Sequence, residues 1–119
     1  MTQNTYKKGT LNLFIYPDKN HFTGVCLELD IIVEGKSAYE VRQELFDGVS
    51  SYVETIIKNK LPESLLNRPA PKEYWDRFFA LLAEEIKAHK NRNLTPTKNS
   101  SFEFMKIPIG DTRRVLQPC

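Results

Sequence analysis

Hydrophobic and polar positions along residues 11–16 follow the two-residue period of a β-strand. Leu11, Leu13 and Ile15 share one face, and Asn12, Phe14 and Tyr16 share the other. Both faces are largely apolar, so we expect a central strand that is covered on both sides. Residues 17–20 have turn composition, residues 22–27 read as the returning hairpin strand, and residues 31–33 as a short third strand.

The spacing changes to that of a helix after Ser37. Ser37 is a good N-cap, and Glu40 three residues later completes a capping box. An apolar stripe at helical spacing then continues to about Lys60. It consists of Val41, Leu45, Val49, Tyr52, Val53 and Ile56. Tyr39, Phe46 and Ile57 lie off this stripe, which predicts contact with the next helix or with a second subunit.

A second amphipathic helix is predicted from about Lys72 to Lys90. Its apolar positions are Trp75, Phe78, Phe79, Leu82 and Ile86. Residues 91–101 read as a polar linker, residues 102–107 alternate as a last strand would, and residues 112–119 read as a loose end. A short helical turn is expected near Leu65, between the two helices.

These elements predict an α+β protein with one domain over residues 1–119. The order along the chain is strand, strand, strand, helix, helix, strand, in a mostly antiparallel sheet of three or four strands with the long helix packed on one face. Residues 9–60 form the expected core, and residues 61–119 carry the second helix and a C-terminal extension. A chain of 119 residues is long enough for one modest core.

Charge is distributed unevenly. Residues 1–86 hold 10 Lys/Arg and 13 Asp/Glu, a net −3, whereas residues 87–119 hold 7 and 2, a net +5. An acidic body argues against a nucleic-acid surface over the whole domain. The basic tail leaves open a nucleic-acid-binding regulator that uses Lys98, Lys106, Arg113 and Arg114.

Candidate catalysts are sparse. The two cysteines, Cys26 and Cys119, and the two histidines, His21 and His89, lie too far apart in sequence for zinc-ligand spacing. The sequence has no glycine-rich phosphate loop. A nuclease metal site would need converging carboxylates, but the candidates fall at strand ends and turns, namely Asp18, Glu28, Asp30 and Glu34. We predict a protein with no catalytic residue, metal or cofactor, although an unidentified enzyme remains an alternative.

Two interaction surfaces are predicted. The first is an acidic surface for a basic partner, and its rival interpretation is an ordinary solvated helix face. It comprises Glu28, Asp30, Glu34, Glu40, Glu44 and Asp47. The second is an oligomer interface formed by apolar residues beyond the main helical stripe, namely Phe14, Tyr16, Phe46 and Ile57. The residues show no signal peptide and no bilayer-length apolar run, so a cytoplasmic location is expected.

Three short motifs resemble the HicB-like antitoxin family. They are Ile15-Tyr16-Pro17-Asp18, then Phe22 to Asp30, then the turn Glu34-Gly35-Lys36-Ser37 with the helix start at Ala38-Tyr39-Glu40-Val41. The chain departs from the family at Val41, where alanine is usual, and at Lys19-Asn20, where Asp-Gly is common. Residues 61–119 also lack a convincing DNA-binding segment.

The resemblance implies a partial RNase H-like fold without the RNase H carboxylates. It also implies dimers or larger oligomers and the binding of a small basic RNA-cleaving toxin, HicA. The alternative interpretation as an unidentified enzyme would place that enzyme on the same RNase H-like scaffold.

Overall fold

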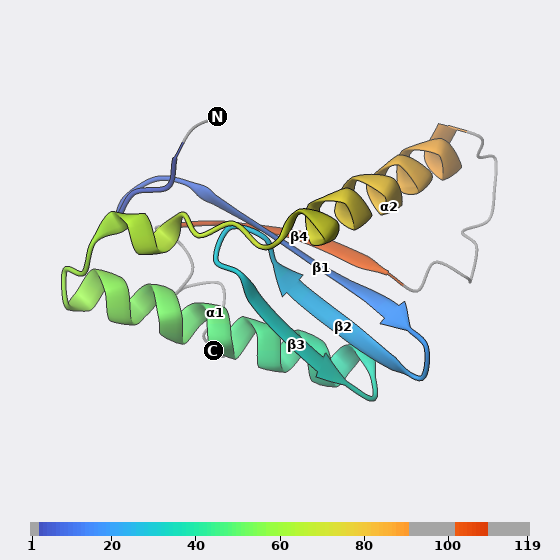
Figure 1. The fold of residues 1–119 in the computed structure, drawn as a ribbon, viewed down its shortest axis with the longest axis horizontal. Coiled ribbons are helices and arrows are strands. Elements are labelled where there is room, and N and C mark those ends of the chain that lie inside the picture. The colour runs from blue at the N-terminus through green and yellow to red at the C-terminus, as the bar shows by residue number, and fades with distance from the viewer. Residues whose placement is uncertain (1–2, 91–101, 110–119) are drawn as a thin grey trace.

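The computed structural model describes residues 3–90 and 102–109, and for residues 88–90 it describes the backbone alone. Its elements are β1 (Thr10–Asp18), β2 (His21–Cys26), β3 (Ile31–Gly35), α1 (Ala38–Lys58), the 3₁₀ turn η1 (Glu63–Leu66), α2 (Lys72–Lys90) and β4 (Glu103–Pro108). They form a four-stranded antiparallel sheet in the order β3-β2-β1-β4 (Figure 1). The predicted α+β class and element order are confirmed.

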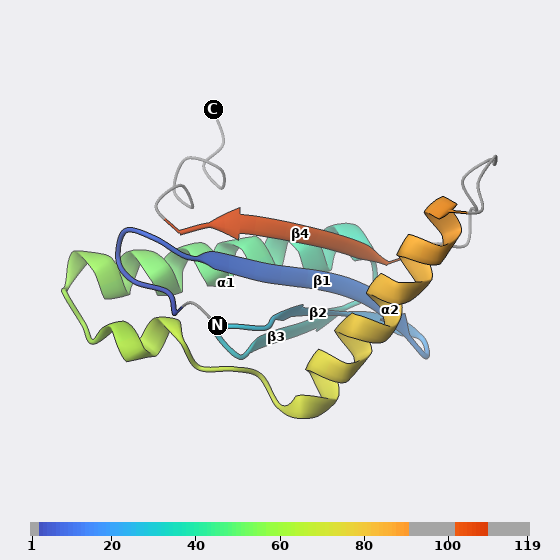
Figure 2. The ribbon, with the colours of Figure 1, turned by 90° about the horizontal axis from the view of Figure 1, so that it is seen from above.

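The two helices lie on opposite faces of the sheet. Figure 1 shows α1 below the strands and α2 above them, and Figure 2 shows α2 crossing the strands near the β1–β2 hairpin. This arrangement covers β1 on both sides, as its two apolar faces predicted. Leu11, Leu13 and Ile15 pack in the cluster that contains α1, whereas Phe14 and Tyr16 pack in the cluster that contains α2.

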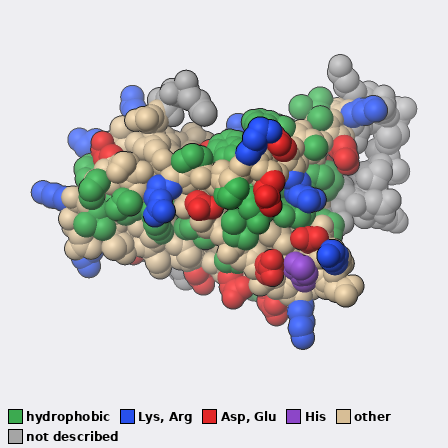
Figure 3. Space-filling view, in the orientation of Figure 1, with side chains coloured by type: hydrophobic (Ala, Val, Ile, Leu, Met, Phe, Trp, Pro, Cys, Tyr) green, Lys and Arg blue, Asp and Glu red, His purple; other side chains and the backbone are tan. Residues whose placement is uncertain are grey.

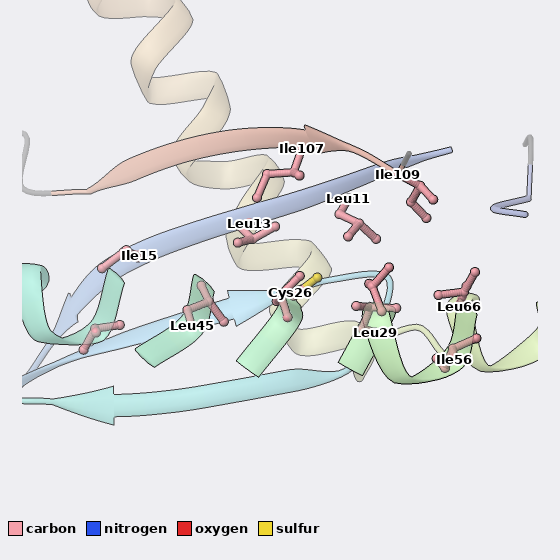
Figure 4. Close-up of a cluster of buried hydrophobic side chains, with 13 residues drawn as sticks. Leu11, Leu13, Ile15, Cys26, Leu29, Leu45, Ile56, Leu66, Ile107 and Ile109 are labelled. Carbon is pink, nitrogen blue, oxygen red and sulfur yellow. The ribbon is translucent and has the colours of Figure 1, made fainter. Parts of the chain in front are cut away.

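The core between the sheet and α1 is built from the predicted stripe. Figure 4 shows Leu11, Leu13 and Ile15 of β1 facing the helix that carries Leu45 and Ile56. The stripe residues Val41, Leu45, Val49, Val53 and Ile56 are all at most 2% exposed, which confirms them as core. Tyr52 is only half-buried, and its hydroxyl donates to the Leu65 carbonyl at 2.8 Å.

The start of α1 is capped as the sequence predicted. The Ser37 hydroxyl accepts from the Glu40 amide at 3.1 Å. The Glu40 carboxylate reaches back to the Lys36 amide at 3.3 Å, so the reciprocal bond falls one residue earlier than in the standard capping box. This cap ends β3 and starts the helix within two residues, which brings α1 directly back over the sheet.

The hairpin between β1 and β2 is tighter than predicted. Pro17 and Asp18 belong to β1, and only Lys19 and Asn20 form the turn. Lys19 takes a left-handed conformation with φ 57°, which lets a two-residue loop reverse the chain. Pro17 is tolerated because β4 pairs with β1 only as far as Ile15, so Pro17 has a neighbouring strand on one side only.

Close approach between α1 and β2 depends on Gly24. A Cβ atom at Gly24 would lie 2.5 Å from Val41 Cγ1, inside van der Waals contact. Gly48 on α1 offers a contrast, because a Cβ atom there would come no closer than 3.9 Å, to Ile31 Cγ2. The backbone of β2 therefore approaches α1 closely at Gly24.

We expect Gly24→Ala to lower the free energy of unfolding by about 1–3 kcal/mol, because the added methyl overpacks the Val41 contact. Gly48→Ala is the matched control, and it should raise stability by up to about 1 kcal/mol because alanine favours a helix interior. Urea denaturation followed by circular dichroism measures both values. Equal effects of the two substitutions would show that α1 does not approach β2 closely at Gly24.

Candidate interaction surfaces

The sheet face beneath α2 is divided into an aromatic half and a polar half. Near the hairpin, Phe14 contacts Phe78 and Phe104 with ring centroids 5.3 and 6.5 Å apart. Towards the other end, side chains of the same face become polar, and the register places Lys106 of β4 beside Asn12 of β1. Because α2 covers the aromatic half, the polar half stays open.

A cavity of about 750 Å³ occupies this open half. Asn12 and Glu28 contribute to its lining from the sheet side, Pro69 from the segment that leads into α2, and Trp75 from near the start of α2 itself. Gln3, Asn4, Lys8, Gly9, Thr10 and Asn67 complete the lining. Its volume lies in the range of small-molecule sites, and it combines apolar and polar groups.

Among the residues that the structure describes, Glu28 is the one acidic group in the lining of this cavity. Its two carboxylate oxygens accept from the backbone amide and the side-chain amide of Asn12, each at 2.6 Å. Burial raises the pKa of the Glu28 carboxyl because it penalises the charged form; the bonds from Asn12 and the charge of Lys106 act in the opposite direction. The neighbouring groups therefore fix the orientation of the carboxylate, but they offset only part of the effect of burial on its pKa.

Asn4 and Asn67 stabilise one wall of the cavity by hydrogen bonds. Asn4 is 5% exposed, donates from its side chain to the Leu66 carbonyl at 3.0 Å and accepts from the Thr10 amide at 3.0 Å. Asn67 accepts from the Asn4 backbone amide at 2.7 Å and donates back to the Asn4 carbonyl at 2.9 Å. These bonds join the N-terminal segment to the connector between the helices, so the cavity wall is held by polar contacts.

A second surface is the outward face of α1. Glu40, Glu44 and Asp47 follow each other at helical spacing and are all exposed, opposite the buried stripe. Between Ala38 and Thr55 the sequence offers one cation, Arg42, and its guanidinium is bound to the Glu103 carboxylate of β4 at 2.9 and 3.1 Å. Figure 3 shows acidic side chains along the lower border of the molecule, over β3 and α1.

The six acidic residues predicted as a partner surface do not share one surface. Glu40, Glu44 and Asp47 lie together on α1. Glu34 lies on β3, with its carboxylate 3.8 Å from His21 Nε2. Glu28 belongs to the cavity on the opposite face of the sheet, and Asp30 is exposed in the β2–β3 turn with φ 56°. Sequence order did not reveal that the sheet separates Glu28 from the helix.

The predicted oligomer interface is wrong for two of its four residues. Phe14 is 0% exposed and Tyr16 4% exposed, because α2 packs over both. Arg77 of α2 also stacks on the Tyr16 ring at 4.7 Å. Phe46 of α1 is half-buried against the core, and Ile57 of the same helix is 36% exposed. Neither contacts the second helix, which lies on the other face of the sheet.

Residues 3–90 and 102–109, excluding the side chains of 88–90, contain no group of three or more potential metal ligands. Cys26 is buried, and burial strongly raises the pKa of its thiol, so it packs as a small apolar group. Lys106 is exposed on β4. Lys98, Arg113, Arg114 and Cys119 lie outside the described residues, as does the side chain of His89.

No helix within the described part of the chain is both long and apolar enough to cross a bilayer. Comparisons with family models, curated proteins and solved structures gave no match to this chain.

The pKa of Glu28 predicts a specific pH dependence of stability. With a raised pKa, the folded state binds more protons than the unfolded state between the two pKa values, so stability falls as pH rises through that interval. We expect the unfolding free energy of the wild type, relative to Glu28→Gln, to decline from about pH 4.3 upwards until Glu28 is ionised in both states. Chemical denaturation between pH 3 and 8 measures this difference, and a difference that rises with pH would contradict the assignment.

Proposed function

We propose that this protein is a HicB-like antitoxin-type interaction protein that binds and neutralises a small basic RNA-cleaving toxin, without catalysis of its own. The observation that carries the proposal is the acidic face of α1. Glu40, Glu44 and Asp47 are exposed together on a rigid helix, and the nearby Arg42 is engaged by Glu103. A continuous acidic stripe attracts a basic protein and speeds its association.

The motif resemblance supports the same conclusion from a different direction. The Glu34–Ser37 turn and the capped start of α1 are among the segments that resemble HicB-like proteins, and they lead directly into the acidic face. A partial RNase H-like arrangement, oligomer formation and a cytoplasmic location belong to this proposal. The α+β sheet with its long helix is compatible with it.

Two alternatives from other classes remain. A nucleic-acid-binding regulator would use the basic residues near the C-terminus, of which Lys106 is exposed on β4. An enzyme on an RNase H-like scaffold would need a converging set of reactive groups, and the cavity contributes one acidic residue, Glu28. The exposed acidic stripe on α1 favours a basic protein partner over either alternative.

Reversal of charge on α1 tests the proposal. The product of the neighbouring reading frame should be a small basic protein that cleaves RNA, and the wild-type protein should bind it and stop the cleavage. Glu44→Lys with Asp47→Lys should weaken binding by at least about ten-fold, mainly through slower association at low salt. Titration calorimetry and an RNA-cleavage assay measure the two effects.

The matched control is Glu73→Lys with Glu84→Lys, which makes the same charge change at exposed positions of α2. It should leave binding within about two-fold of wild type. If both double variants lost the same amount of binding, the loss would be due to net charge alone. The acidic face of α1 would then not be the binding surface. Sequence-selective binding to the upstream DNA of the operon, with no effect on RNA cleavage, would instead establish the regulator.

We also propose that the chain self-associates through the flank of α1 that carries Tyr39 and Ile57. These side chains are 65% and 36% exposed, and helical spacing places them on the same side of α1 as half-buried Phe46. Light scattering at tens of micromolar should give the mass of a dimer or larger, and Tyr39→Lys with Ile57→Lys should give 13.8 kDa monomers. Phe79→Lys, at an exposed aromatic on α2, is the control that should keep the oligomer. A monomeric wild type would reject self-association.

A further inference from the structure

The cavity on the open half of the sheet pairs an oriented carboxylate with the single tryptophan of the chain. Glu28, in the turn after β2, and Trp75, near the start of α2, both line it. Asn12 fixes both oxygens of Glu28 through its backbone and side-chain amides. A carboxylate oxygen carries more than one lone pair, so Glu28 can still accept from a ligand.

No cation of the described residues neutralises Glu28 directly. The ion pairs of this part of the chain join Arg42 to Glu103 and Lys72 to Asp76, and His21 lies near Asp18 and Glu34. None of these pairs includes Glu28. Lys106 acts on Glu28 through its charge, and the exposed Lys8 lines the cavity without an ion pair to it. A half-buried carboxylate without an ion-pair partner favours an incoming cation.

Trp75 defines the second requirement of the ligand. The indole face is the best aromatic partner for a cation, and guanidinium groups also stack on it. Pro69 adds an apolar surface to the same cavity. A ligand that suits both Glu28 and Trp75 therefore carries a positive charge with several hydrogen-bond donors, and it has a flat or apolar body.

We infer that the cavity formed by Glu28, Asn12 and Trp75 is a binding site for an organic cation of side-chain size, a guanidinium or alkylammonium group. The guanidinium fits best, because its planar fork donates to a carboxylate and its face stacks on an aromatic ring. The cation is either a free small molecule or an arginine side chain of a protein. The inference does not rest on the proposed function, since the cavity lies on the face of the sheet opposite α1.

Tryptophan fluorescence tests this inference directly, because Trp75 is the only tryptophan. The full chain is titrated with agmatine and with N-acetyl-arginine amide, and N-acetyl-citrulline amide serves as the uncharged control. We expect saturable changes for the cations with Kd on the order of 1 mM, and none for citrulline. Tighter binding of agmatine would identify a free ligand as the source, and tighter binding of the capped arginine a protein side chain. Saturation by citrulline as strong as that by arginine would overturn the inference.

Three variants separate recognition from folding. Glu28→Gln should weaken the cations at least about ten-fold, while Glu44→Gln, the same change on the far face of the molecule, should leave them unchanged. Glu28→Gln also disturbs the bonds to Asn12, so its fold is checked by circular dichroism. Lys8→Gln removes a competing positive charge without a buried contact and should tighten binding about two-fold or more. Weaker binding by Lys8→Gln, or no loss in a folded Glu28→Gln protein, would overturn the assignment whatever the outcome with the toxin.

Discussion

The central position of β1, with apolar side chains on both of its faces, is the constraint on which the rest of the structure depends. A strand of this kind has to be covered twice. The α1 layer covers Leu11, Leu13 and Ile15, and the α2 layer covers Phe14 and Tyr16. The capped start of α1, the close approach at Gly24 and the connector that carries the chain to the opposite face all serve this double cover.

The two interaction surfaces arise because α1 and α2 cover the two faces of the sheet differently. The α1 layer is a long amphipathic helix whose outer face is left to solvent and carries acidic residues. The α2 layer crosses only part of the sheet, so polar side chains of the same strands stay open beside it (Figure 2). One surface is therefore convex and charged, and the other is concave and mixed. Surfaces of these two shapes suit different ligands, a protein face and a single side chain or small molecule.

Local patterns predicted most elements of this fold. The alternation in β1, the Ser37 cap and the stripe of α1 are encoded in neighbouring residues, and the structure confirms them. The interface prediction for Phe14 and Tyr16 failed because the residues that bury them are some sixty positions away, in α2. No local periodicity shows on which face of a sheet a later helix packs. The capped helix start was readable from the sequence, whereas the cavity was not.

The cavity depends on pairs that are distant in sequence. Asn4 and Asn67 hold one wall, and Asn12 and Glu28 form the floor. In the sequence these residues look like ordinary polar positions, so nothing distinguishes them from a solvated loop.

The placement of β4 has a consequence for how the chain is made. β1 pairs with β2 through a two-residue turn, but its other edge pairs with β4, roughly ninety residues later in the chain. During synthesis the first three strands and α1 are complete while that edge still exposes unpaired backbone groups. Such an edge is a template for pairing with other chains. The nascent protein is therefore most vulnerable to aggregation just before residues 103–108 leave the ribosome, and closure of the sheet is a late, long-range step of folding.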